Sequence, residues 1–156
     1  MTMGLELEYR FSKLEELVKR AADRNLDELT ASYFCRLGSV LICGNIERCF
    51  EIIVLNWARR KCPEQVGNFF RRYFNRGTNY DCEEIKNFLY RLDKAWGERF
   101  EAFVADHDEV STSISSCYAV RNSVAHGGGG SLGPKSLRQY FDASFSLIAE
   151  LDDIVK

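Results

Sequence analysis

Three polar side chains near residue 120 are of types that could act together on a phosphodiester. Arg121 and Asn122 are adjacent, and His126 follows five residues after the arginine. A guanidinium can hold a phosphate through two parallel hydrogen bonds and stabilise negative charge on its oxygens. An imidazole titrates near neutrality, so it can take a proton from a 2′-hydroxyl or give one to a leaving oxygen. The residue types therefore predict cleavage of RNA by its own 2′-oxygen, which requires no metal.

The segment that carries these side chains is expected to be a helix, because apolar residues recur through it at helical spacing. The helix is expected to stop at His126, with Gly127 as its C-terminal signal. Five residues separate two helical side chains by about 140° and about 7.5 Å of rise, so Arg121 and His126 do not share one stripe. Asn122 and His126 are neighbours four residues apart, and the amide is expected to orient the imidazole.

A purely structural explanation exists for the same residues. The chain has several arginines for each of its 2 histidines, so this spacing arises readily by chance. A surface arginine and a histidine at a helix C-terminus are also favourable on their own, because positive charge is stabilised there.

The context of the motif adds specificity. The segment from Ala119 to His126 resembles the R-x4-6-H signature of the HEPN nucleases, a superfamily of small all-helical proteins. In that family a polar residue, often Asn, follows the arginine, and one more helix follows the motif. The segment from Val40 to Glu47 is similar to the long second helix of the RiboL-PSP-HEPN-like branch, often found near RNA-processing and defence genes. One residue departs from a related group: Gly128 replaces the Tyr of HEPN toxins that pair with nucleotidyltransferase antitoxins.

The resemblance implies a metal-independent endoribonuclease with no cofactor. Arg121 would stabilise the phosphate, and His126 would transfer protons. Asn122 would orient the imidazole of His126, and Glu47 would hold the guanidinium of Arg121. An exposed glutamate without that role is the alternative for Glu47. Cleavage needs an acid and a base, and the resemblance implies a homodimer whose facing motifs supply two histidines. It further implies a toxin or phage-defence setting, with an antitoxin or another regulator as a candidate partner. The rival interpretation is a non-catalytic helical module for dimerisation or scaffolding.

Length and composition predict one soluble all-α domain over residues 1–156, a bundle of five to six helices. The chain has 156 residues, is 46% hydrophobic and contains only 2 prolines. Such a chain can bury a sizeable core, and its long periodic runs favour helices over a β-sandwich. The net charge of −2 excludes a chain that is basic overall, so any RNA contact must be local.

The cysteines and the absence of long apolar runs predict a cytoplasmic protein. None of the 6 cysteines forms a C-x-x-C pair, and most lie in apolar helical patterns. They are therefore expected to be reduced and buried, and a metal site is not expected. No signal-peptide core or membrane-length apolar run is present.

The periodicity divides the chain into expected helices. These lie at about residues 5–25, 27–61, 64–75, 81–104 and 108 or 111–126, with a last helix from Pro134. Gly97 could divide the fourth of them, and a glycine-rich linker occupies residues 127–134. In the last helix, residues 137, 141, 144, 148, 151 and 155 repeat at spacings that pack a helix along a partner.

The helix near residue 70 offers a second candidate contact with RNA. Arg71 and Arg72 stand among four aromatic residues, and basic residues amid aromatics can bind single-stranded RNA by stacking and phosphate contact. The alternative is that the aromatics belong to the core and the arginines are a solvated edge.

Overall fold

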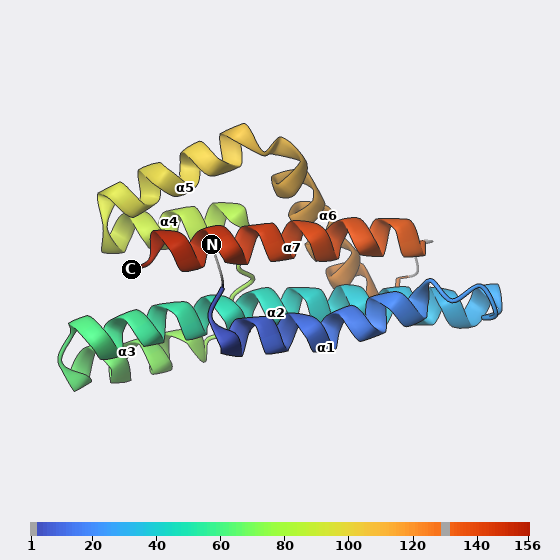
Figure 1. Ribbon diagram of the computed structural model, residues 1–156, viewed down its shortest axis with the longest axis horizontal. Coiled ribbons are helices and arrows are strands. Elements are labelled where there is room, and N and C mark those ends of the chain that lie inside the picture. The colour runs from blue at the N-terminus through green and yellow to red at the C-terminus, as the bar shows by residue number, and fades with distance from the viewer. Residues whose placement is uncertain (1–2, 129–131) are drawn as a thin grey trace.

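The computed structural model describes residues 3–128 and 132–156, which form an all-helical bundle (Figure 1). The described residues contain no strand. The predicted linker falls partly on residues 129–131, outside the described residues. The helices are α1 (Leu5–Ala21), α2 (Glu28–Lys61), α3 (Glu64–Phe74), α4 (Cys82–Leu92), α5 (Lys94–Asp106), α6 (Asp108–Ala125) and α7 (Pro134–Ile154).

The predicted all-α class is confirmed, but the described residues form seven helices where five to six were expected. The additional break lies at Asp93, within the segment expected to be one helix. Asp93 has an extended backbone with φ −154° and ψ 121°, and its carboxylate accepts hydrogen bonds from the backbone N–H groups of Ala95 and Trp96. This N-cap begins α5 immediately after α4 ends.

Gly97, the expected point of division, instead lies buried inside α5, where it contacts α4. A Cβ atom added there would lie 2.4 Å from Cγ of Tyr90. The missing side chain therefore lets the Tyr90 ring pack directly on the backbone of α5. The Tyr90 hydroxyl donates a hydrogen bond of 2.6 Å to Glu101, which also joins the two helices.

The long helix α2 is the centre of the bundle, as its apolar pattern predicts. Its 34 residues give it a length of roughly 50 Å. It packs against α1, α3, α6 and α7. Beside it, the ring of Phe50 meets those of Phe74, Tyr80 and Phe88 at 5.1 to 5.8 Å between centroids. Burial on several faces explains why α2 shows no single apolar stripe.

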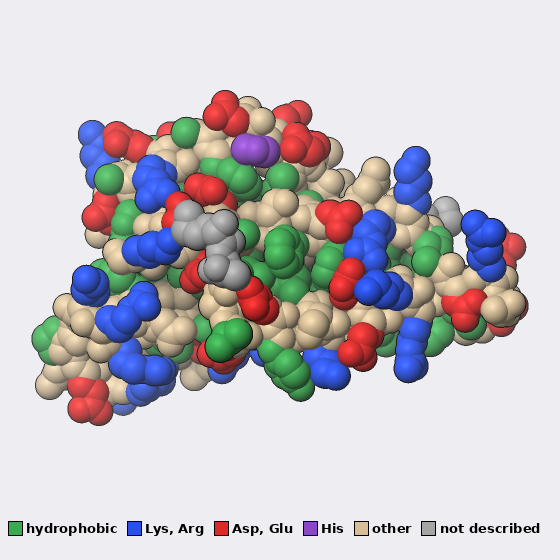
Figure 2. Space-filling model, in the orientation of Figure 1, with side chains coloured by type: hydrophobic (Ala, Val, Ile, Leu, Met, Phe, Trp, Pro, Cys, Tyr) green, Lys and Arg blue, Asp and Glu red, His purple; other side chains and the backbone are tan. Residues whose placement is uncertain are grey.

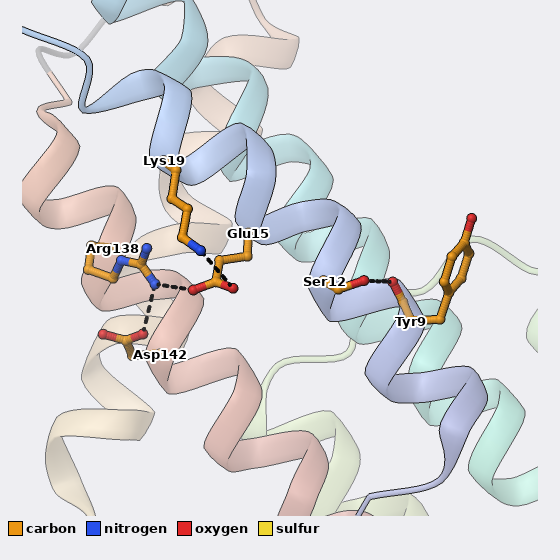
Figure 3. A network of polar contacts seen from close by, with 6 residues as sticks. All are labelled: Tyr9, Ser12, Glu15, Lys19, Arg138 and Asp142. Atoms are coloured by element: carbon orange, nitrogen blue, oxygen red, sulfur yellow. Dashed lines mark hydrogen bonds and ion pairs between the residues drawn. The ribbon is translucent and has the colours of Figure 1, made fainter.

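The last helix, α7, runs along the bundle and presents the predicted repeat to its interior. All six repeat positions are buried. On the surface, Arg138 of α7 lies 3.5 Å from Glu15 of α1 and 3.5 Å from Asp142 (Figure 3). Figure 3 also shows Lys19 reaching the same Glu15 carboxylate. Exposed pairs of this kind contribute little, so the apolar repeat is what holds α7 in place.

The surface carries mixed charges, with Lys and Arg gathered at the end where α2 meets α3 (Figure 2). All six cysteines are free, and five of them are buried, as expected. No helix among the described residues has the length and apolar character needed to span a bilayer.

The close contact at Gly97 predicts that Gly97→Ala destabilises the fold by about 1–3 kcal/mol, because the added methyl group must displace the Tyr90 ring. Gly67→Ala in α3 is the matched control: nothing lies within 4 Å of its added Cβ, so helix propensity should leave it neutral or more stable. Urea unfolding of both variants measures the difference. Equal stabilities would contradict the close contact.

Candidate functional site

The helix α6 carries the motif and ends in a glycine-dependent cap. The N–H of Gly127 donates to the carbonyl of Val124, and the N–H of Gly128 donates to that of Ser123 at 2.8 Å. Gly127 has φ 74°, a left-handed conformation that favours glycine. This pairing is the Schellman motif. The helix ends at Ala125 with His126 as its C-cap, one residue before the glycine that the sequence predicts as the stop.

Arg121 lies one turn before this end and is held by two partners from other parts of the chain. Its Nη2 atom lies 3.7 Å from Oε1 of Glu47 in α2. Its Nη1 atom donates a hydrogen bond to Oδ1 of Asn79, in the loop between α3 and α4. The Arg121 side chain remains 29% exposed. A guanidinium has five N–H donors, so these two contacts leave others free for a ligand.

Packing one turn earlier on each helix positions the arginine and the glutamate. The sulfur atoms of Cys43 in α2 and Cys117 in α6 lie 3.6 Å apart in the core. Both residues are fully buried. Because residues four apart stack on one helix face, this contact places Glu47 and Arg121 opposite each other at the next turn.

A second tie brings the loop between α3 and α4 to the same place. The hydroxyl of Tyr118, next to Cys117 on α6, donates a hydrogen bond of 3.2 Å to the backbone carbonyl of Tyr80. Asn79 directly precedes Tyr80, so this bond fixes the segment that delivers its side chain to Arg121. The Tyr80 ring is buried against Phe50 and Phe74.

Burial sets the electrostatics around Arg121. Burial raises the pKa of Glu47 above its usual value, and the charge of Arg121 offsets only part of this effect. Oε1 of Glu47 is buried without a hydrogen-bond partner among the described residues. Burial also raises the pKa of Tyr80 to about 12 and raises that of Tyr118. Both phenols therefore stay neutral at physiological pH and add no negative charge that would repel a phosphate.

His126 and Asn122 are exposed, and the structure does not bring them to Arg121. Within the described residues, neither side chain makes a hydrogen bond or ion pair, either with the other or with the arginine. A single chain thus presents a fixed guanidinium near the end of α6 and, at the C-cap of the same helix but not in contact with it, an imidazole without a partner among the described residues. The arrangement can bind an oxyanion and exchange a proton with solvent or with a ligand.

The two arginines of α3 lie on different sides of their helix. Arg71 donates a hydrogen bond of 2.7 Å to Asn68. It also lines a hollow of about 170 Å³ near Arg59 and Pro63. Arg72, one residue later, is exposed and turned about 100° away around the helix. The two guanidiniums therefore point to different sides of α3, and contact of either with RNA stays a prediction.

Sequence reasoning missed Asn79. Asn79 falls between the helices expected at about residues 64–75 and 81–104, in a loop where Gly77 has φ 68°. Asn79 and Arg121 are 42 residues apart. An asparagine in a turn is common, so no local signal distinguishes this one. Among residues 3–128 and 132–156, no three His, Cys, Asp or Glu side chains gather as metal ligands would.

The raised pKa of Glu47 predicts an effect of pH on stability. An acid whose pKa is raised by folding stabilises the folded state below its unfolded pKa of about 4.3, and this contribution is lost as pH rises through the folded value. Glu47→Gln removes that loss. Its free energy of unfolding should therefore fall less than that of the wild type between pH 4 and pH 7.

Urea unfolding at the two pH values measures this difference. Glu16→Gln is the control, because that carboxylate has a side chain that is 64% exposed. If Glu47→Gln lost the same stability as the wild type over this range, ionisation of Glu47 would not oppose folding.

Comparisons with known proteins bear on this site. A search of curated proteins found no match to the chain, and neither did a search of solved structures. The family model described as RiboL-PSP-HEPN matches residues 5–156. The match spans all seven described helices and includes Glu47, Asn79, Arg121 and His126. The chain therefore belongs to the RiboL-PSP-HEPN family.

Proposed function

We propose that this chain is a metal-independent endoribonuclease of the HEPN type. The observation that carries the proposal is the motif arginine. Arg121 is held at two points, by Asn79 and Glu47, and still exposes 29% of its side chain beside the helix end that bears His126. A guanidinium fixed in this way loses little freedom when it binds a phosphate, which favours charge stabilisation in the transition state.

The proposed reaction is an internal transesterification of RNA. A base takes the proton of the 2′-hydroxyl, and the 2′-oxygen attacks the adjacent phosphorus. The bond from phosphorus to the 5′-oxygen breaks, and an acid protonates that oxygen. Arg121 stabilises the charge on the non-bridging oxygens, while His126 supplies the proton transfers and Asn122 orients it. The products are a 2′,3′-cyclic phosphate and a 5′-hydroxyl.

A homodimer would supply the acid and the base from two copies of His126. The outer face of α2 supports this arrangement, because large apolar residues are exposed there at a spacing of four. Leu29, Tyr33, Leu37 and Leu41 expose 64%, 58%, 48% and 43% of their surfaces. A contiguous exposed apolar stripe of this kind is typical of an interaction surface. A second copy of the chain would cover it in a two-fold symmetric contact.

Gly44 continues this stripe towards Glu47. A glycine inside a helix costs about 1 kcal/mol relative to alanine. No atom of the chain lies within 4 Å of a Cβ built at Gly44, so packing within the described chain does not require a glycine here. Close approach of a partner helix would account for it.

A second candidate function is a non-catalytic interaction module. It is favoured by one observation: an open hollow of about 640 Å³ lies between α6 and α7 and is lined by Asp108, Glu109 and Asp142, not by motif residues. In that case Arg121 would serve mainly to join α2, α6 and the loop at Asn79. A toxin or phage-defence role, a regulator and a cytoplasmic location belong to the proposal through the family alone.

The ribonuclease proposal predicts cleavage of single-stranded RNA in EDTA, with cyclic phosphate ends and no cutting of DNA. Arg121→Lys should lose about 10²-fold or more in rate, nearly as much as Arg121→Ala, because lysine keeps the charge but not the planar fork. Mass spectrometry of the products and rates in excess EDTA provide the measurements. Circular dichroism must show both variants folded. An unfolded Arg121→Ala would make the arginine structural and favour the interaction module, whereas an Arg121→Lys rate near that of the wild type would mean that charge alone suffices.

The shared site predicts that a dimer with one wild-type and one His126→Ala chain is nearly inactive. Each cleavage would lose its acid or its base, which typically costs about 10² to 10⁴ in rate. The mutant should still dimerise, because His126 is an exposed C-cap residue of α6 and does not belong to the apolar stripe of α2. Two affinity tags allow the mixed dimer to be purified and assayed on RNA. An activity near half of wild type would mean that each chain carries a complete site.

A further inference from the structure

The outer face of α3 combines aromatic and basic side chains. Phe69, Arg72 and Arg76 follow one another at spacings of three and four, so they lie on one side of the helix and its end. Phe69 is 60% exposed, whereas its neighbour Phe70 is 4% exposed and packs against Trp57 and Phe88. The aromatic residues of α3 are thus divided: Phe70 belongs to the core, and Phe69 is presented to solvent.

The side chains of this face are arranged as a stacking surface. The rings of Phe69 and Tyr73 lie 6.2 Å apart between centroids, at an interplanar angle of 33°. The guanidinium of Arg76 lies 5.8 Å from the centroid of the Tyr73 ring. Within the described chain, neither Arg72 nor Arg76 forms an ion pair with a carboxylate. The face therefore offers aromatic rings and two cations whose charge no acidic side chain neutralises.

This face leads directly to Arg121. Asn79 is the third residue after Arg76, so their Cα atoms are at most about 11 Å apart. Asn79 accepts the hydrogen bond from Arg121. A ligand that lies along Phe69 and Arg76 would therefore need to extend only a short distance along the loop to contact Arg121.

We propose that Phe69, Arg72, Tyr73 and Arg76, called here the α3 face, bind single-stranded RNA and guide it to Arg121. The proposal rests on the proposed ribonuclease function and names the form of its substrate. The exposed ring of Phe69 can stack on an unpaired base, the half-buried Tyr73 ring supports it from the helix side, and the arginines can contact the neighbouring phosphates. A duplex keeps its bases stacked internally, so the rings would gain nothing from it. An acidic protein would satisfy the arginines but would leave Phe69 without a partner.

The chain supplies a matched control for this face. Arg71 has the same charge as Arg72 and is its neighbour in sequence. It is turned towards the hollow beside Arg59, where it bonds to Asn68. Removing Arg71 changes the net charge by the same amount without touching the α3 face.

The test measures fluorescence anisotropy of the full chain with a labelled single-stranded 2′-O-methyl RNA, which cannot be cleaved through its 2′-oxygen. Phe69→Ala should weaken binding about tenfold, and Phe69→Tyr should restore it. Arg72→Ala and Arg76→Ala should each lower the slope of log affinity against log salt by about 0.7. Arg71→Ala should bind as the wild type does.

Other results would overturn the α3 face. Equal losses for Arg71→Ala and Arg72→Ala would mean that only overall charge matters. Unchanged binding by Phe69→Ala, no binding of RNA by the wild type, or equal competition by polyglutamate would each exclude stacking on this face. The outcome is separable from that of the ribonuclease proposal. A wild type that binds through Phe69 but cuts no RNA would overturn the nuclease alone, and one that cuts RNA with no loss in Phe69→Ala would overturn the α3 face alone.

Discussion

The contact between the two buried thiols of α2 and α6 is the constraint on which the candidate site depends. Cys43 and Cys117 lie 3.6 Å apart between their sulfur atoms, and both side chains are fully buried between the two helices. A close-packed core leaves little freedom to slide one helix along the other. The next turn of each helix therefore brings Glu47 and Arg121 together, and the depth of the same contact keeps Glu47 partly out of water. The raised pKa of this carboxylate is a consequence of the packing that positions it.

Periodicity in the sequence identified the elements that bury one continuous stripe. The predicted repeat in α7 is buried, whereas α2 is covered on several sides and has no single buried stripe. The periodicity does not reveal the break at Asp93, because Phe88, Leu92 and Trp96 keep the spacing of a single helix. Only the capping bonds of Asp93 reveal the new start, and an aspartate in a helical pattern is equally often a solvated side chain.

The candidate site was predictable only where its residues lie on one helix. Arg121, Asn122 and His126 share α6, and their spacing was visible in the sequence. Asn79 comes from a loop whose position depends on the Tyr118 hydrogen bond and on the aromatic cluster around Phe50. Such contacts form only when the core packs, so they leave no pattern in the local sequence. The same limit applies to α3. Helical spacing places Arg72 on the side of Phe69, but only the packing of α3 shows that Phe69 is exposed and Phe70 is buried.

The exposed features of the chain fall into two kinds that call for different partners. On α2, Arg36 is the only charged residue between the exposed residues Leu29 and Leu41. No neighbouring element of the described chain covers the helix at Gly44. On α3, a single exposed ring stands between arginines. Association of the first surface would be hydrophobic and insensitive to salt, whereas binding at the second would weaken steeply as salt screens the phosphates. Since Arg121 lies between Glu47 of α2 and Asn79 of the loop that follows α3, a partner chain on one side and an RNA strand on the other would meet at this guanidinium.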